Sequence, residues 1–246
     1  FSRHLSWLYT YSPDWAESVI IPALLSRDED EYHAAWDGLL SSGKILGERI
    51  YARLTPQILS LAVTNKQAHH TEILANIVLK GWVWINSTTG SSFISDSELR
   101  DILLNTSEQF REDILLQIKY WLGDKETGKT PRWYTLIPKF LGEIWPKQKY
   151  MRNEKVTSIL CDIAFADEER FPEIVENVLP HMTCISKQYL PYYKVLSRDK
   201  SVVDRYPERT LTLIFTVLTE DARNWPYGID RILSRIEQAD STLAGD

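Results

Sequence analysis

The spacing of apolar residues constrains the fold of this chain more than any other feature. Apolar residues recur at steps of three and four along most of the sequence, as in EQFREDILLQIKYWL (108–122), where they share one face of a helix. The same spacing predicts further helices over 31–40, 71–85, 154–166 and 228–239. The sequence therefore predicts an all-α protein.

Two β-branched runs imitate strands. They are IVLKGWVWI (77–85) and LTLIFTVL (211–218), and both extend into helix-length apolar patterns. No segment shows a sustained apolar–polar alternation bounded by turn residues, which is the pattern of a half-buried strand. We therefore assign both runs to helices. The polar segment NSTTGSSFIS (86–95) is interpreted as an exposed loop.

Prolines divide the chain at regular intervals. Each of five follows a polar or aromatic residue and opens an apolar run: Pro13, Pro56, Pro131, Pro172 and Pro207. This predicts the first turn of a helix, where a missing N–H costs nothing. The spacings are 43, 75, 41 and 35 residues, and the longest corresponds to two units. Within it, Ser95 and Glu98 predict a capping box.

Two segments resemble one another. RFPEIVENVLPHM (170–182) and RYPERTLTLIFTVL (205–218) both begin with Arg, an aromatic residue, Pro and Glu. A proline also follows apolar residues in VIIPALL (19–25), LIPKFL (136–141) and VLPHM (178–182), where it should kink or end a helix. A repeat of 35 to 43 residues with two amphipathic helices is typical of HEAT-like α-solenoids. We predict a single stack of antiparallel helix pairs over residues 1–246.

Composition narrows the class of protein. Ten Gly in 246 residues is few for an α/β nucleotide-binding fold, and most of the nine Trp lie in apolar runs, so we interpret them mainly as core. The net charge of −6 does not favour a dedicated nucleic-acid binder. Cys161 and Cys184 are predicted to be reduced, buried thiols. No apolar run is long enough for a membrane span and no signal peptide is visible, so we expect a cytoplasmic protein.

The stretch GDKETGKT (123–130) matches the phosphate-binding pattern G-x-x-x-x-G-K-T. A working loop of this kind needs a buried strand before it and a helix N-terminus after it. Here an amphipathic helix precedes it, Gly123 is expected to end that helix, and Pro131 follows at once. We interpret the stretch as a turn between helices. A degenerate nucleotide-binding domain that uses Gly128, Lys129 and Thr130 remains an alternative.

Side chains for catalysis or metal binding are not grouped in the sequence. His69 and His70 are adjacent and point about 100° apart on a helix, and the pair His69 and Glu72 lacks a third ligand nearby. No Ser or Cys has an evident base partner. We predict no catalytic residue, no cofactor and no metal, and hence no enzyme.

Two stretches offer candidate contact residues. The basic stretch 125–155 interleaves cations with Trp133, Tyr134, Trp145 and Tyr150, a mixture that can follow a nucleic-acid backbone or meet an acidic protein or phosphate. In WPYG, two aromatic residues flank Pro226, either as a contact patch or as packing for the last helix. The contact candidates are Lys129, Arg132, Lys147, Lys149, Arg152, Trp225 and Tyr227.

Three segments resemble a known family. They are DWAESVIIPALLSRDEDEYHAAWDGLL (14–40), 170–182 and RYPERTLTLIFTVLTEDARNWPYGIDRILSRIEQADSTLA (205–244). They are similar to the helical C-terminal region of large bacterial proteins that carry a sirtuin-like, NAD-handling N-terminal domain, several of which act against phage. The resemblance implies that the enzymatic domain lies upstream and that this region is a sensor, scaffold or oligomerisation arm. It carries no catalytic residue onto this chain.

The leading hypothesis is a non-catalytic helical module for protein interaction that regulates an upstream effector in antiphage defence. Because the sequence starts at Phe1, we expect it to be part of a longer protein. The expected partner is an upstream domain, a second copy or a phage protein, with no membrane partner. The alternative is a nucleic-acid-binding solenoid that uses residues 125–155.

Overall fold

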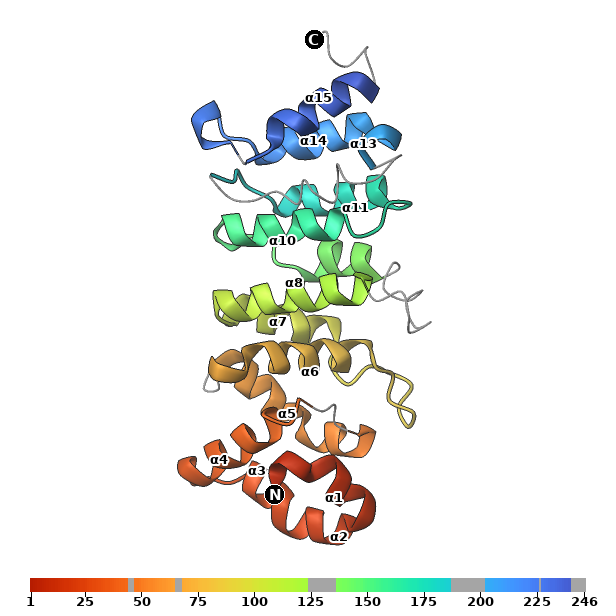
Figure 1. Ribbon diagram of the computed structural model, residues 1–246. Coiled ribbons are helices and arrows are strands. Elements are labelled where there is room, and N and C mark those ends of the chain that lie inside the picture. The colour runs from red at the N-terminus through yellow and green to blue at the C-terminus, as the bar shows by residue number, and fades with distance from the viewer. Residues whose placement is uncertain (44–46, 65–67, 124–135, 187–201, 226, 240–246) are drawn as a thin grey trace. The chain divides into compact units, whose positions relative to one another are not determined.

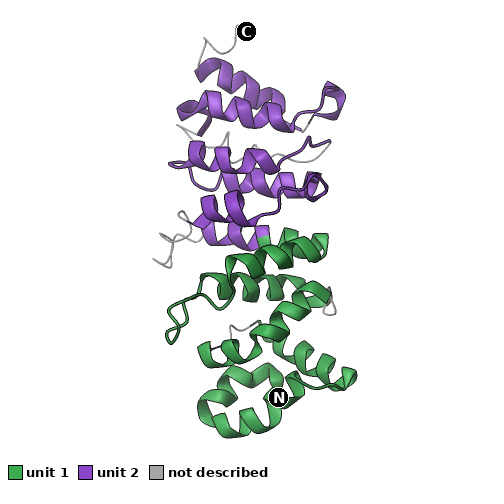
Figure 2. Ribbon diagram, turned by 180° about the vertical axis from the view of Figure 1, so that it is seen from behind, with its two compact units in different colours: residues 1–114 green, residues 115–246 purple. Residues whose placement is uncertain are grey.

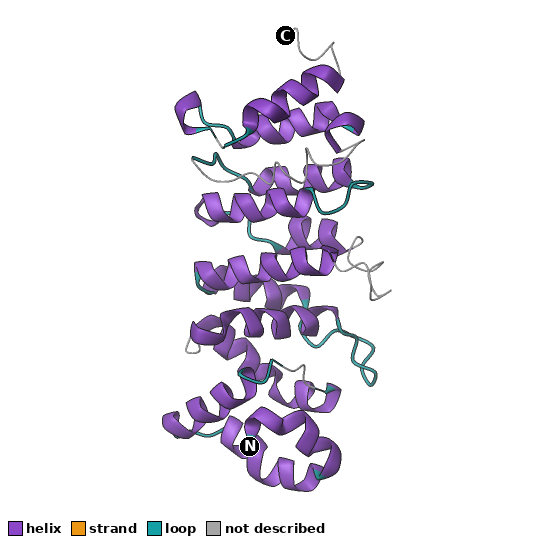
Figure 3. Ribbon diagram, in the orientation of Figure 1, coloured by secondary structure: helices purple, strands orange, loops and turns teal. Residues whose placement is uncertain are grey.

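The chain is helical almost throughout. The computed structural model describes residues 1–43, 47–64, 68–123, 136–186, 202–225 and 227–239. Figure 3 shows helices joined by loops, and in the described ranges the only β-type pairing is an isolated antiparallel bridge between Ile85 and Ser92. The prediction of an all-α protein is confirmed.

The described residues form two compact units. Unit 1 is Phe1–Ile114 and unit 2 is Leu115–Asp246 (Figure 2). Helix α8 (Glu108–Gly123) begins in unit 1 and ends in unit 2. The assignment of residues 1–246 to a single domain stays a prediction.

Unit 1 is built from short N-terminal helices followed by longer ones (Figure 1). In chain order these are η1 (Ser2–His4), α1 (Leu5–Tyr11), α2 (Pro13–Trp15), η2 (Ala16–Ile20), α3 (Ile21–Leu24), α4 (Glu29–Leu40), α5 (Glu48–Thr64), η3 (Ala68–His70), α6 (Thr71–Val83) and α7 (Asp96–Asn105).

Pro13 opens a helix, as predicted, and the helix then continues through α2, η2 and α3. The middle portion, η2, is a π-turn that closes with a bond from the Ile21 N–H to the Ala16 carbonyl. Pro22 follows directly and has no N–H of its own. A wider turn before a proline relieves the contact between its ring and the preceding carbonyls.

Helix α5 contradicts one prediction. Pro56 lies in its interior and does not open a helix, because the helix begins at Glu48. An interior proline costs about 3 kcal/mol. Upstream of it, Ile50, Tyr51 and Leu54 are buried. Each such side chain contributes roughly 1.5–3 kcal/mol when buried, so together they outweigh that cost.

Helices α5 and α6 meet at a small residue. The Tyr51 hydroxyl donates a 2.8 Å hydrogen bond to the Ile77 carbonyl. A Cβ at Gly81 would lie 2.0 Å from the Tyr51 hydroxyl, so only glycine fits there. The next helix, α7, starts with the predicted capping box, in which the Ser95 hydroxyl and the Glu98 carboxylate each bond the other's backbone N–H. The connection over 86–95 is a largely exposed loop in which Ile94 is buried.

Unit 2 is also built from helices. After the end of α8 and a helical turn over 136–139, its elements are η4 (Phe140–Ile144), η5 (Lys149–Met151), α10 (Glu154–Ala164), α11 (Phe171–Val178), η6 (Leu179–His181), α13 (Val202–Arg205), α14 (Pro207–Val217), η7 (Ala222–Asn224) and α15 (Ile229–Ala239). Most of each run that imitates a strand lies on a helix, because residues 77–83 belong to α6 and residues 211–217 to α14. The first run was predicted to be helical to its end, but Ile85 lies beyond α6 and forms the β-bridge to Ser92.

The two self-similar segments of unit 2 are neighbours. Helices α11 and α14 contact one another, and each has a proline in its first turn, as predicted for Pro172 and Pro207. The aromatic residues of the shared motif, Phe171 and Tyr206, stack with ring centroids 6.3 Å apart and planes 24° apart. At the other end of α11, Pro180 ends the α-helix, which gives way to the tighter turn η6.

Ion pairs join the helices of unit 2. They connect α8 with α10 through Lys119–Asp162, α11 with α14 through Arg209–Glu176, and α13 with α15 through Arg235–Asp204.

One prediction about the cysteine thiols of unit 2 is wrong. Cys161 is free and buried, as expected, whereas Cys184 is free but exposed. Cys184 lies just before residue 185 on an irregular segment, where no helix face determines which side chains are buried.

Candidate partner-binding surfaces

The first candidate surface is the basic connector, residues 145–152, between η4 and α10. Lys147, Lys149 and Arg152 are exposed, and in the described part of the chain no ion pair engages them. Tyr150 is 68 % exposed beside them, whereas Trp145 is buried and packs on Phe140 at 5.8 Å. Of the aromatic residues predicted to interleave with these cations, Tyr150 can meet a ligand and Trp145 belongs to the core.

A buried histidine adjoins the basic connector. His181 of η6 is 2 % exposed, and its Nε2 lies 2.8 Å from the Leu141 carbonyl. Burial lowers the pKa of His181, the hydrogen bond to Leu141 opposes this, and the positive charges of Arg152 and Lys147 lower it further. The positive charges of the basic connector therefore favour the neutral form of the His181 imidazole.

The other two basic candidates, Lys129 and Arg132, lie outside the described residues, as does GDKETGKT after Gly123. The flanks of that stretch are described. Helix α8 runs into it, ending at Gly123, and the described chain resumes at a helical turn over 136–139. The prediction that a helix and not a strand precedes the stretch is confirmed.

The two aromatic candidates of the WPYG segment differ in environment. Trp225 is half-buried, and its indole N–H donates a 2.8 Å hydrogen bond to the Thr219 carbonyl. Trp225 therefore packs in the turn between α14 and α15. Of the two roles considered for WPYG, this environment corresponds to packing for the last helix. Tyr227 is exposed, and Gly228 follows it with φ 82°.

The first helices of unit 1 carry an exposed aromatic face that was not predicted from the sequence. Trp7 is 55 % exposed and Tyr11 is 72 % exposed, with ring centroids 4.8 Å apart. Phe1 is also exposed and packs edge-on against Trp15 at 5.6 Å. Trp7 and Tyr11 are four residues apart, Leu8 lies between them and Leu5 precedes them. That spacing also fits a buried helix face, so the sequence alone does not tell an exposed aromatic face from a core one.

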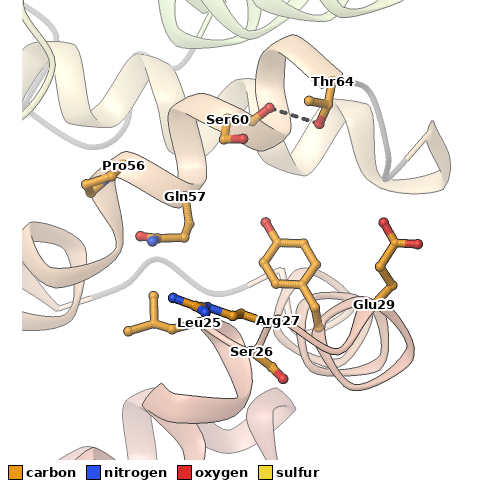
Figure 4. Close-up of a pocket in the computed structure, with 9 residues that line it drawn as sticks. Leu25, Ser26, Arg27, Glu29, Pro56, Gln57, Ser60 and Thr64 are labelled. Carbon is orange, nitrogen blue, oxygen red and sulfur yellow. Dashed lines mark hydrogen bonds between the residues drawn. The ribbon is translucent and has the colours of Figure 1, made fainter.

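A second missed feature is a pocket in unit 1. It is open, has a volume of about 380 Å³ and lies between α5 and the segment that leads into α4 (Figure 4). Its lining is Leu25, Ser26, Arg27, Glu29, Tyr32, Pro56, Gln57, Ser60 and Thr64. Burial raises the pKa of the Tyr32 hydroxyl. No local pattern in the sequence marks this pocket, because its two walls come from separate segments of the chain.

The described residues contain neither a cluster of metal ligands nor a membrane-spanning helix. His69 lies in the short turn η3, one turn before α6, and His70 Nε2 lies 3.7 Å from Asp37 Oδ1. Across the described ranges, no group of three His, Cys, Asp or Glu side chains is arranged to hold a metal ion. In the same ranges, no helix is both long and apolar enough to cross a bilayer.

Comparisons with known proteins give limited similarity. No family model matches the chain, and no solved structure matches it. The chain is 21 % identical over 154 residues to an uncharacterized protein of Sinorhizobium fredii, y4cA. The aligned segment is 62 % of this chain and 13 % of that protein, so the chain spans a small part of its relative's length.

Proposed function

We propose that this chain is a non-catalytic, HEAT-like helical repeat module that binds protein partners. The single observation that carries the proposal is the packing of α11 on α14. The two segments share the motif Arg-aromatic-Pro-Glu, and the equivalent aromatic residues Phe171 and Tyr206 stack on one another. Equivalent residues of adjacent units meet in this way when repeats are stacked in register.

The proposal also draws on the surface of unit 1. Exposed aromatic side chains are enriched at protein–protein interfaces, because they provide a large contact area at low cost in side-chain entropy. Trp7 and Tyr11 form such a surface and contact one another. A second copy of this chain or a different protein bound to this surface would bury both rings.

The proposed role in the cell rests on the resemblance that residues 14–40, 170–182 and 205–244 show to the helical region of those bacterial proteins. We propose that the module regulates an effector domain of a larger bacterial protein in antiphage defence. The segment that aligns with this chain is 13 % of y4cA. The proposal that the module belongs to a longer protein is compatible with that share. Binding of a phage or cellular protein to the helical surface would be transmitted to the effector through the packed helices.

A phage challenge tests this proposal. Bacteria would carry the native gene intact, lacking the region of residues 1–246, or with Trp7→Ser and Tyr11→Ser. We expect both altered genes to lose protection, measured as plating efficiency. Tyr120→Ser, which alters another exposed aromatic residue, is the control. Full protection without the region would contradict the proposal, as would turnover of NAD or nucleoside triphosphates by the purified chain.

A second candidate function is binding of nucleic acid by the basic connector, which the exposed cations Lys147, Lys149 and Arg152 favour. If they contact phosphates, the triple change to Gln should weaken binding to duplex DNA. It should also flatten the salt dependence by about 0.9 in the log–log slope for each contact removed. Arg231→Gln on α15 is the control. Equal loss in the control, or no binding by the unaltered chain, would reject this function.

A further inference from the structure

The backbone of the basic connector is fixed at both ends. At its start, Trp145 is 1 % exposed, and its backbone N–H donates to the Phe140 carbonyl at 2.7 Å. Just past its end, the Asn153 side chain caps α10 by accepting from the Val156 N–H at 2.7 Å. The side chains between these two anchors therefore extend from a backbone of defined conformation.

Within the connector, the single turn η5 separates the side chains by direction. It closes with a 3.1 Å hydrogen bond from the Arg152 N–H to the Lys149 carbonyl. In a 3₁₀ turn, side chains three residues apart lie one above the other, so Lys149 and Arg152 share one edge. Met151 takes the buried edge, at 2 % exposure, and Tyr150 takes the third edge, at 68 % exposure. The turn therefore presents an aromatic ring beside two cations.

The connector carries positive charge alone. It contains the cations Lys147, Lys149 and Arg152 and no carboxylate. Burial lowers the pKa of the His181 imidazole, and Arg152 and Lys147 both lower it further, so both cations lie near the same ring. Salt screens charges that are more than about 8 Å apart at physiological ionic strength. A ligand at the connector therefore meets this local charge and not the net charge of −6.

Two carboxylates flank the connector in sequence. Glu154 is half-buried in the first turn of α10, and it accepts a 2.6 Å hydrogen bond from the Ser186 hydroxyl. A carboxylate at that position also interacts favourably with the helix dipole of α10. Glu143 lies on η4, and the buried residues 144–146 separate it from the cations in sequence. Both acids therefore lie outside the turn that presents Tyr150.

An exposed ring beside cations favours one class of anion. In single-stranded nucleic acid, the phosphates contact cations and an unpaired base stacks on an aromatic ring. In a duplex, each base face is already covered by the neighbouring base pairs, so Tyr150 would find no face to stack on. An acidic peptide would pair with Lys149 and Arg152 and has no general need of the ring. The combination of the three side chains therefore fits an unpaired strand best.

We propose that the basic connector binds single-stranded nucleic acid, with Tyr150 stacked on a base and Lys147, Lys149 and Arg152 in contact with the flanking phosphates. This inference rests on the second candidate function in one respect, namely that the connector binds nucleic acid. It adds that the strand is unpaired. It also names Tyr150 as the residue that distinguishes an unpaired strand from a duplex.

Three labelled probes of equal length test the inference. They are an oligothymidylate of about 12 nucleotides, an abasic strand with the same phosphates and no bases, and a duplex. Each would be titrated with the full chain and followed by fluorescence anisotropy. We expect the oligothymidylate to bind most tightly and Tyr150→Ala to weaken that binding at least about fivefold. The same variant should leave the affinities for the abasic strand and the duplex unchanged.

Matched variants assign the effect to the connector. Tyr150→Phe keeps the ring and should restore most of the affinity for the oligothymidylate. Phe215→Ala removes another exposed ring of unit 2, at 64 % exposure, and should change nothing. Replacing Lys147, Lys149 and Arg152 by Gln should weaken all three probes. For the single strand, it should reduce the log–log salt slope by about 0.7 for each phosphate contact removed. Thermal unfolding confirms the fold of each variant.

Several outcomes would overturn the inference. They are equal affinity for strand and duplex, equal loss of the abasic strand in Tyr150→Ala, equal loss in Phe215→Ala, and displacement of the strand by an equal concentration of oligoglutamate. The last outcome would assign the connector to an acidic protein.

Failure of this inference is distinguishable from failure of the functions proposed above. Equal binding of all three probes would retain nucleic-acid binding through phosphates and reject the stacking of Tyr150. Absence of binding by every probe would reject both this inference and the second candidate function. Neither result affects the phage challenge, because that experiment reads the aromatic face of Trp7 and Tyr11.

Discussion

In unit 1, α5 meets α6 through shape, whereas in unit 2, α11 meets α14 through charge and a ring stack. Tyr51 occupies the space that Gly81 leaves, and its hydroxyl bonds the Ile77 carbonyl. Arg209 and Glu176 instead pair at 2.6 Å, with side chains that are 45 % and 58 % exposed. A buried steric fit tolerates almost no substitution, whereas an exposed ion pair contributes little and tolerates many.

The largest expected effect is at the steric contact. Gly81→Ala places a Cβ 2.0 Å from the Tyr51 hydroxyl and 2.5 Å from its Cζ, so α5 and α6 must separate. We expect a loss of about 3 kcal/mol in unfolding free energy and a drop in Tm of roughly 6–12 °C. Thermal unfolding followed by circular dichroism measures this. Gly142→Ala, where nothing lies within 4 Å of the added Cβ, should leave Tm unchanged or raise it.

A smaller effect is expected from the hydroxyl alone. Tyr51→Phe removes the hydrogen bond to Ile77 and should cost about 1 kcal/mol. It also removes the atom closest to an added Cβ at Gly81. The double variant should therefore lose less stability than the sum of the two single losses. Strict additivity would show that α5 and α6 do not depend on this fit.

Acid should affect unit 2 through His181. Burial lowers the pKa of His181 in the folded state below its ordinary value of 6.5. Below that value the unfolded chain binds the proton more readily, so stability is full above pH 6.5 and declines as pH falls toward the folded pKa. Urea unfolding at pH 7.5, 6.5 and 5.5 would measure this. In His181→Gln the decline should be shallower, and parallel profiles would refute this role.

The smallest effect is expected at the exposed ion pair. A double-mutant cycle on Arg209 and Glu176 should give roughly 0.2–1 kcal/mol at low salt, and almost nothing near 1 M salt. Arg235 offers a sharper comparison, because its Nε and Nη2 donate to both carboxylate oxygens of Asp204 at 3.0 and 2.9 Å. That bidentate, less exposed pair should show a larger coupling energy. A larger value for Arg209–Glu176 would reverse the order.

Several features could be predicted because they depend on neighbours in sequence. The helices over 31–40, 108–122 and 154–166 follow from apolar residues three and four positions apart. The capping box of Ser95 and Glu98 closes within one turn. Pro172 and Pro207 lie in first turns because their fixed φ suits that position.

The candidate surfaces could be predicted only in part. The exposed cations of the basic connector were found from composition, but Trp145 and Tyr150, five residues apart, have opposite environments. The pocket depends on residues 25–32 approaching residues 56–64, and no local pattern encodes that approach. Pro56 was placed wrongly for the same reason, because the burial that outweighs its cost comes from other helices.

The sequence by itself determined that this chain is helical, where several of its helices begin, and that two segments of unit 2 share the motif Arg-aromatic-Pro-Glu. Those properties arise from hydrogen bonds and side-chain periodicity within one or two turns. The tertiary structure decided that Trp7 and Tyr11 are exposed, that Gly81 must be glycine, and that Lys147 and Arg152 lie near His181. Each of these properties depends on two segments that are distant in the sequence. Burial, steric fit and the distance between charges are defined only once the folded chain brings those segments together.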